Sequence, residues 1–157
     1  MSAALPRHGE IAAGCHRCVF RVYYEDTDAG GVVYYANYLK IAERARTEML
    51  RCLGVEQEKL RREAGIGLVV RRCTADFIAP ARLDDELTVL TRLAAQAGAA
   101  LELAQEIRRG EETLARLDSK IACIAANGRP TRLPAPLLAA LATLTRHIQT
   151  EAAAHAR

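Results

Sequence analysis

The order of the predicted elements restricts the fold more than any other feature of the sequence. A strand pattern at residues 16–24 precedes one long helical pattern, and four more strand patterns follow at 67–78, 86–95, 101–107 and 112–126. Turn signals join these strands in sequence, and a single helix among them must bury its apolar stripe against their sheet. We therefore predict an α+β domain in which an antiparallel five-stranded sheet wraps around one long helix, followed by a C-terminal helix.

The helical pattern runs from about Tyr35 to Leu53, with Gly54 as its stop signal. Its apolar stripe consists of Tyr38, Ile41, Ala42, Ala45, Met49 and Cys52 or Leu53. A short polar helix is predicted at 56–64, and a final helix, opened by Pro134 and Pro136, at 136–150. The long helix is thus expected to supply the face around which the sheet closes.

The length of 157 residues fits a single domain. We expect a flexible N-terminal tail at 1–15, one domain at 16–150 and a frayed C-terminus at 151–157. The net charge is only +3 and the arginines are scattered, which argues against a nucleic-acid partner. No apolar run approaches the length of a membrane span and no signal-peptide pattern is present, so a cytoplasmic location is expected.

Five cysteines are too widely spread for a disulfide framework and agree with a reducing compartment. Cys15 and Cys18 form a single C-x-x-C pair with no second pair to complete a zinc site, so both are interpreted as small apolar side chains. Sequence motifs of nucleotide-binding loops, serine hydrolases and zinc proteases are absent. We predict neither a metal site nor a cofactor.

An acidic, glycine-containing turn at residues 25–31 stands directly before the long helix. A helix start offers unpaired backbone N–H groups and a positive dipole end that can hold an oxyanion, and a nearby carboxylate can act as a base or nucleophile. Spacing alone equally allows Asp26 and Asp28 to be caps or turn formers. Both interpretations are open on the residues alone.

A specific resemblance favours the catalytic interpretation. Residues 24–34 (Tyr-Glu-Asp-Thr-Asp-Ala-Gly-Gly-Val-Val-Tyr), 36–39 (Ala-Asn-Tyr-Leu) and 43–46 (Glu-Arg-Ala-Arg) resemble the hotdog-fold acyl-CoA thioesterases. The most similar subgroup is the Tol-Pal-associated (YbgC-type) thioesterases, with the 4-hydroxybenzoyl-CoA thioesterases as relatives. The similarity continues through residues 73–85 and 128–130. It implies hydrolysis of an acyl-CoA, or of an acyl-carrier-protein thioester, to a free acid and the thiol.

The resemblance implies that Asp28 is the catalytic carboxylate, as nucleophile or as general base, and that the backbone N–H of Tyr35 receives the oxyanion. Glu25 and Asp26 are interpreted as turn or hydrogen-bonding residues. Many members carry His where Tyr35 stands, but either residue supplies the backbone N–H. The Tyr35 side chain is expected to line the acyl pocket, with a hydrogen bond to Asp28 or simple packing as alternatives.

Further residues are assigned to substrate binding. Gly31, Val32 and Tyr34 belong to the loop. Glu43 lies two turns along the helix and is either a second candidate for the catalytic carboxylate or a hydrogen-bonded structural or interface acid. Coenzyme A carries phosphates, and the basic residues expected near them are Arg71, Arg72, Arg82, Arg129 and Arg132. Among these, Arg129 and Arg132 are favoured, because they lie in the loop after the last strand, where the resemblance implies that the pantetheine and nucleotide of coenzyme A pass.

The resemblance also implies assembly. Hotdog domains pair their sheets edge to edge and place the active site between subunits, so we expect at least a homodimer and favour a homotetramer. A non-catalytic acyl-CoA or acyl-carrier-protein binding module on the same fold is the alternative function. A hotdog dehydratase fits less well, because no suitable pair of His with Asp or Glu is evident.

Overall fold

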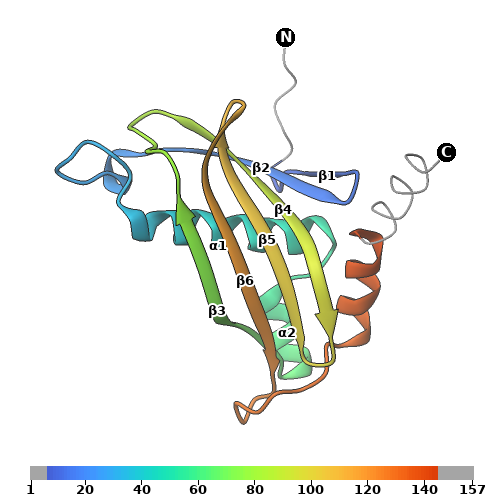
Figure 1. Ribbon diagram of the computed structural model, residues 1–157. Helices are drawn as coiled ribbons and strands as arrows, with labels where there is room; N and C mark the ends of the chain where they lie inside the picture. Colours follow the sequence, from blue (N-terminus) through green and yellow to red (C-terminus); the bar gives the residue numbers. More distant parts are fainter. Residues whose placement is uncertain (1–6, 145–157) are drawn as a thin grey trace.

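A computed structural model describes residues 7–144, and these form one curved antiparallel sheet around a long helix (Figure 1). Within that range the sheet has six strands in the order β1-β2-β4-β5-β6-β3. Their bounds are β1 Glu10–Ala12, β2 Cys15–Arg21, β3 Gly67–Phe77, β4 Glu86–Ala97, β5 Ala100–Arg109 and β6 Glu112–Ile124. The predicted α+β class, the antiparallel pairing and the four strands after the helix are confirmed.

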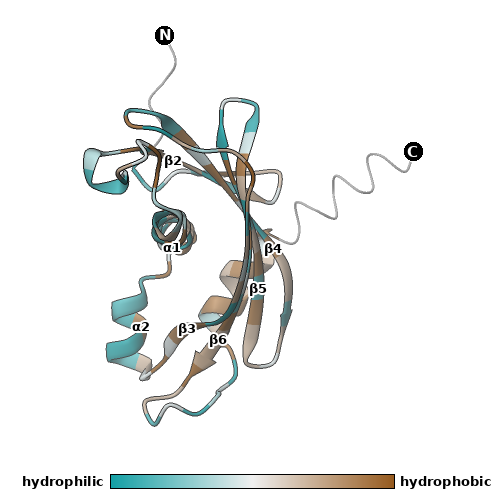
Figure 2. Ribbon diagram, turned by 60° about the vertical axis from the view of Figure 1, so that its left-hand side comes forward, coloured by the Kyte–Doolittle hydropathy of each residue, from teal (hydrophilic) through white to brown (hydrophobic). Residues whose placement is uncertain are grey.

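Helix α1 (Tyr35–Cys52) lies against the concave face of the sheet, which bends around it (Figure 2). Its buried residues are Tyr38, Ile41, Ala42, Ala45, Met49 and Leu50, which confirms most of the predicted stripe. Cys52 is exposed, because α1 ends there beyond the part that the sheet covers. Helix α2 (Gln57–Ala64) buries no residue and ends at Gly65, whose left-handed backbone (φ 66°) closes it as predicted.

The prediction for the N-terminal segment is wrong at two places. Residues 10–12, expected in a flexible tail, form strand β1 and pair with β2. Strand β2 ends at Arg21 rather than 24, because the chain turns into a 3₁₀ helix over Tyr24–Asp26, where the Asp26 carboxylate accepts the Tyr23 N–H at 2.8 Å. Side-chain competition for backbone donors favours such a turn over a continued strand.

The C-terminal helix covers the far end of the concave face. It is helical from 135, and within the described range Leu137, Leu141 and Leu144 are fully buried in a cluster with Met49 and Leu101. The predicted continuation to 150, the frayed residues 151–157 and the first six residues lie outside the described range. Among residues 7–144, no helix is long and apolar enough to cross a membrane.

Leu137→Ala is expected to destabilise the fold by about 2–5 kcal/mol, because it removes a fully buried side chain and leaves a cavity in this cluster. Leu138→Ala is the matched control, since the Leu138 side chain is 39 % exposed. Urea unfolding of both variants measures the difference. Equal free energies of unfolding would show that the C-terminal helix does not belong to the core.

Candidate active site

The start of α1 is fixed to the acidic loop by two hydrogen bonds to one carbonyl. The Asp26 carbonyl oxygen accepts the Tyr34 N–H at 3.0 Å and the Asn37 side-chain amide at 2.8 Å. Tyr34 is the N-cap residue, and its side chain makes no capping hydrogen bond. Among residues 7–144, no acceptor is found for the backbone N–H of Tyr35. The first turn of α1 therefore offers a free donor at its positive dipole end.

Asp28 sits in a tight turn immediately before this helix start. Its carbonyl accepts the Gly31 N–H at 3.0 Å, and its carboxylate oxygen Oδ1 accepts the Gly30 N–H at 2.8 Å. Gly31 has φ 76°, a conformation that glycine adopts at little cost. The Asp28 side chain is exposed. One carboxylate oxygen is thus held by the turn, while among the described residues no hydrogen-bond partner is found for the other.

The wall beside Asp28 comes from a distant part of the chain. An open hollow is lined by Asp28, Gly31, Tyr24 and Leu83, together with Thr27 and Ala29. Leu83 reaches it because two contacts hold its loop on the helix start: the Val33 N–H donates to the Ala81 carbonyl at 2.8 Å, and the Ala81 N–H donates to the Tyr38 hydroxyl at 2.9 Å. A substrate could therefore approach Asp28 from solvent.

Aromatic rings form the other side of the helix start. The Tyr35 ring lies edge-on to Tyr34, with centroids 4.9 Å apart, and edge-on to Phe77 at the end of β3, at 5.8 Å. Phe77 also packs on Tyr38, at 5.6 Å. A hydrogen bond with Tyr35 raises the pKa of the Tyr34 hydroxyl, and the charge of Asp28 adds to this shift. The Tyr35 ring thus packs against Tyr34 and Phe77, and its place in the acyl pocket stays a prediction.

The structure does not bring all predicted site residues together. Val32 is half-buried and bridges to Arg82, next to Asp28 in the same loop. Glu43 instead lines a separate pocket farther along α1, where its carboxylate accepts the Thr47 hydroxyl at 3.0 Å. Within one subunit, Val32 and Glu43 therefore lie at two separate places.

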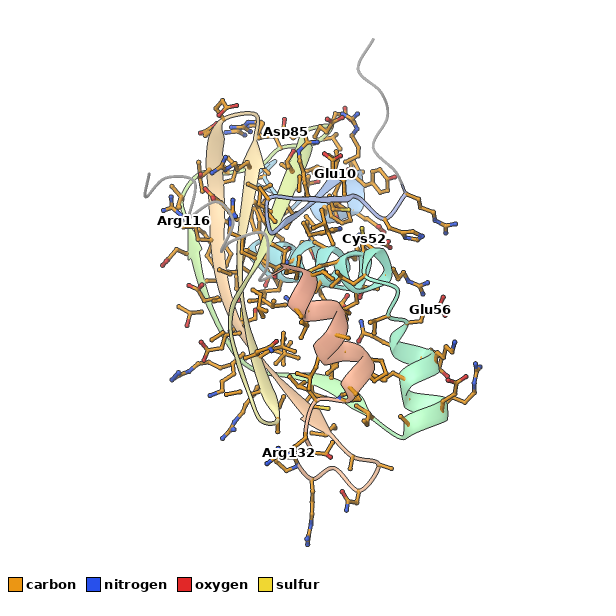
Figure 3. All side chains as sticks on the ribbon, turned by 90° about the vertical axis from the view of Figure 1, so that its right-hand side faces the viewer. Glu10, Cys52, Glu56, Asp85, Arg116 and Arg132 are labelled. Carbon is orange, nitrogen blue, oxygen red and sulfur yellow. The ribbon has the colours of Figure 1, made fainter. Side chains whose placement is uncertain are left out.

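The predicted phosphate-binding arginines lie farther away still. Arg129 and Arg132 follow β6 in the loop beside Gly67, the first residue of β3, whereas the Asp28 loop adjoins Phe77 at the other end of that strand. Figure 3 shows Arg132 at the end of the molecule opposite Asp85. An eleven-residue strand is about 35 Å long, so these arginines cannot reach Asp28 of their own subunit.

Sequence reasoning missed Phe77, Leu83 and Tyr24 as neighbours of the site. Leu83 and Phe77 fall within the stretch 73–85 that carries the resemblance, but no periodicity places them beside residue 28 or 35. Among residues 7–144, no group of three or more His, Cys, Asp or Glu is placed to hold a metal ion.

A curved antiparallel sheet wrapped around one long helix, with a carboxylate-bearing turn at the helix start, is the arrangement that the resemblance to the hotdog-fold thioesterases implies. Comparison with known proteins agrees: the chain belongs to the thioesterase-like superfamily, whose family model matches residues 22–141.

Individual relatives support this assignment. The acyl-CoA thioester hydrolase YbgC of Escherichia coli is 51 % identical over 94 residues, covering 60 % of this chain and 69 % of the relative. The crystal structure of a probable thioesterase from Bartonella henselae is 39 % identical, with a TM-score of 0.73, and covers 76 % of this chain and 99 % of that one. A 1,4-dihydroxy-2-naphthoyl-CoA thioesterase from Synechocystis is 26 % identical, with a TM-score of 0.77 over 82 % of this chain and 96 % of that one. The resemblance to the YbgC-type proteins is confirmed, and the Tol-Pal association stays a prediction.

Proposed function

We propose that the protein hydrolyses acyl-CoA thioesters to a free acid and coenzyme A, with Asp28 as the catalytic carboxylate and the Tyr35 backbone N–H as the oxyanion donor. The observation that carries this proposal is the Tyr35 N–H at the start of α1, for which residues 7–144 offer no acceptor, next to a turn whose exposed carboxylate has one oxygen without a donor among the same residues. The similarity to named acyl-CoA thioester hydrolases supports the substrate class. The reaction requires no metal or redox cofactor, and we propose none.

The chemistry follows from these two groups. In the general-base route, Asp28 takes a proton from water as the water oxygen attacks the thioester carbonyl, whose oxygen gains negative charge and is held by the Tyr35 N–H. When the carbonyl re-forms, the carbon–sulfur bond breaks and the proton passes to the leaving thiolate. In the nucleophilic route, Asp28 attacks the carbonyl carbon, the carbon–sulfur bond breaks to release the thiolate, and water then hydrolyses the mixed anhydride and supplies the proton that the thiolate takes up.

A panel of short, long and aromatic acyl-CoAs tests the activity, with the released thiol measured spectroscopically. Turnover of at least one class is expected. Binding of acyl-CoA without turnover of any class would instead support the non-catalytic binding module. A single turnover in ¹⁸O-labelled water separates the two routes, because only the nucleophilic route transfers the label into Asp28.

The complete site requires a second subunit. Strand β3 is an edge strand with a free side, and it exposes the apolar side chains of Val69, Val70 and Phe77. An unpaired, apolar edge of this kind favours pairing with another strand. Antiparallel pairing of two β3 strands would place the partner's Gly67 end beside this subunit's Phe77. We propose that the homodimer thereby brings Arg129 and Arg132 of the partner subunit to the Asp28 loop, where they bind the phosphates of coenzyme A.

Val69→Lys is expected to convert the assembly to monomers, because the substitution buries a charge in the proposed β3 interface. Analytical ultracentrifugation measures the mass, with Ala94→Lys, on an exposed position of β4, as the control. An unchanged mass for Val69→Lys would place the interface elsewhere. Assembly of dimers into a tetramer and a cytoplasmic location stay predictions of the sequence.

A further inference from the structure

A second pocket lies between α1, α2 and the sheet. It encloses about 90 Å³, which is room for several water-sized groups, and therefore for a polar group with a few methylenes. Most of its wall is aliphatic and includes Met49, Leu68, Val70, Leu101 and Ile121. Three polar side chains interrupt this wall, and their arrangement determines what the pocket can accept.

The first polar side chain is Arg46, which is partly buried. Its guanidinium donates to the Gln105 side-chain oxygen at 3.0 Å, and Gln105 in turn donates to the Ala42 carbonyl and the Thr91 hydroxyl. Burial lowers the pKa of Arg46, an effect that the charge of Glu43 partly opposes. A guanidinium has five N–H groups, and among residues 7–144 Gln105 is the one acceptor that this guanidinium contacts. Arg46 thus keeps donors available to a ligand in the pocket.

The other two polar side chains, Glu43 and Gln57, are linked through Thr47. The Gln57 amide donates to the Thr47 hydroxyl at 3.2 Å, and that hydroxyl donates to Glu43 Oε1 at 3.0 Å. For the second carboxylate oxygen, the described residues offer no hydrogen-bond donor. The pocket therefore presents a charged donor and a charged acceptor close together in an apolar wall. A neutral group that both accepts and donates matches this pair.

One face of helix α1 runs from the candidate active site to this pocket. Tyr35, Leu39 and Glu43 are spaced by four residues and share one face of α1, which faces β3 at both ends: Tyr35 contacts Phe77, and Glu43 lines the pocket with Val70. Leu39 between them is 40 % exposed. Eight residues of helix span about 12 Å. An extended chain advances about 1.2 Å per bond, so about ten bonds cover this distance.

We infer that the pocket lined by Arg46 and Glu43 holds the far end of the acyl group and selects a terminal hydroxyl on a medium-length chain. Arg46 donates to the hydroxyl oxygen, and the hydroxyl donates to Glu43. A methyl end leaves both charged groups without this contact, and a carboxylate end meets the negative charge of Glu43. This inference rests on the proposed acyl-CoA hydrolysis and specifies its substrate class.

Three CoA thioesters test the selection: decanoyl, ω-hydroxydecanoyl and ω-carboxynonanoyl. The wild type is expected to show a kcat/KM at least about tenfold higher for the hydroxylated chain than for either other chain, the factor that one charge-assisted hydrogen bond supplies. Arg46→Met should reduce the ratio of the hydroxylated chain to the decanoyl chain to about one, whereas Arg44→Met, an exposed arginine on the same helix, should leave it unchanged. Equal rates on the three chains, or a preference for the carboxylate, would overturn the inference.

Calorimetric binding of free ω-hydroxydecanoic acid and decanoic acid to the wild-type protein provides a readout that does not depend on catalysis. Tighter binding of the hydroxy acid, lost in Glu43→Leu, supports the pocket even if Asp28 proves not to be catalytic. Because Glu43 is exposed, Glu43→Leu tests the pocket should Arg46→Met fail to fold. Equal binding of the two acids would refute the pocket assignment and leave the proposed hydrolysis standing.

Discussion

Asp28→Asn is expected to lower kcat for acyl-CoA hydrolysis by at least about 10²–10⁴-fold, the range that a general base contributes, and by more if Asp28 is the nucleophile. The fold should be retained, because an asparagine oxygen can accept the Gly30 N–H that Asp28 Oδ1 accepts at 2.8 Å. Substrate affinity should change little, since the substitution alters one side-chain group in an open hollow. The rate of thiol release from acyl-CoA, at saturating substrate, measures the effect.

Asp26→Asn is the matched control for this experiment. Its carboxylate is also in the acidic loop, but it accepts the Tyr23 N–H at 2.8 Å and shapes the turn. We expect it to keep most of the activity and to change chiefly the melting temperature. A larger loss of kcat in Asp26→Asn than in Asp28→Asn would transfer the catalytic role to Asp26.

Tyr35→Pro is expected to lower kcat by about 10²–10³-fold, because it deletes the backbone N–H that is proposed to hold the oxyanion. Proline is well tolerated at the first position of a helix, and the preceding Tyr34 has φ −62° and ψ 132°, a conformation that a following proline permits. Since this N–H has no acceptor among the described residues, its loss should cost little stability.

Tyr35→Ala separates the backbone from the side chain. It removes the ring that packs on Phe77 but keeps the N–H, so it is expected to retain far more activity than Tyr35→Pro. Steady-state kinetics of the two variants, together with their melting temperatures, make the comparison. Equal losses in both variants would assign the effect to the ring and remove the oxyanion role from this N–H.

Local patterns predicted much of the fold. The alternation of Leu87, Val89 and Leu93 predicted strand β4, and the helical spacing of Tyr38, Ile41 and Ala45 predicted the buried face of α1. Both patterns are informative because the side chains that recur with the period of the element point into the core. The tail prediction failed at β1. A strand of three residues is too short to show an alternating pattern, and β1 is a strand because it pairs with β2.

The candidate site could be predicted only where its residues are neighbours in sequence. Asp28, Gly31 and Tyr35 lie in one loop and one helix start, so turn chemistry and the family resemblance were sufficient to group them. Leu83 and Phe77 join them through strand pairing and long-range hydrogen bonds, which no local pattern specifies. Arg46 belongs to the stretch 43–46 that carries the resemblance, but no local pattern indicates its proposed role, because the pocket that it lines has walls from three strands and two helices.

By itself, the sequence determined the class of fold, the position of the acidic turn at the helix start, and the family to which the chain belongs, because each depends on residues close together along the chain. Tertiary structure decided that Asp28 and Glu43 line separate pockets, and that Arg129 and Arg132 lie a full strand length from Asp28 of their own subunit. The physical reason is the length of β3, whose two ends lie at opposite ends of the sheet. The acidic loop adjoins one end of this strand, and the loop that carries Arg129 and Arg132 adjoins the other.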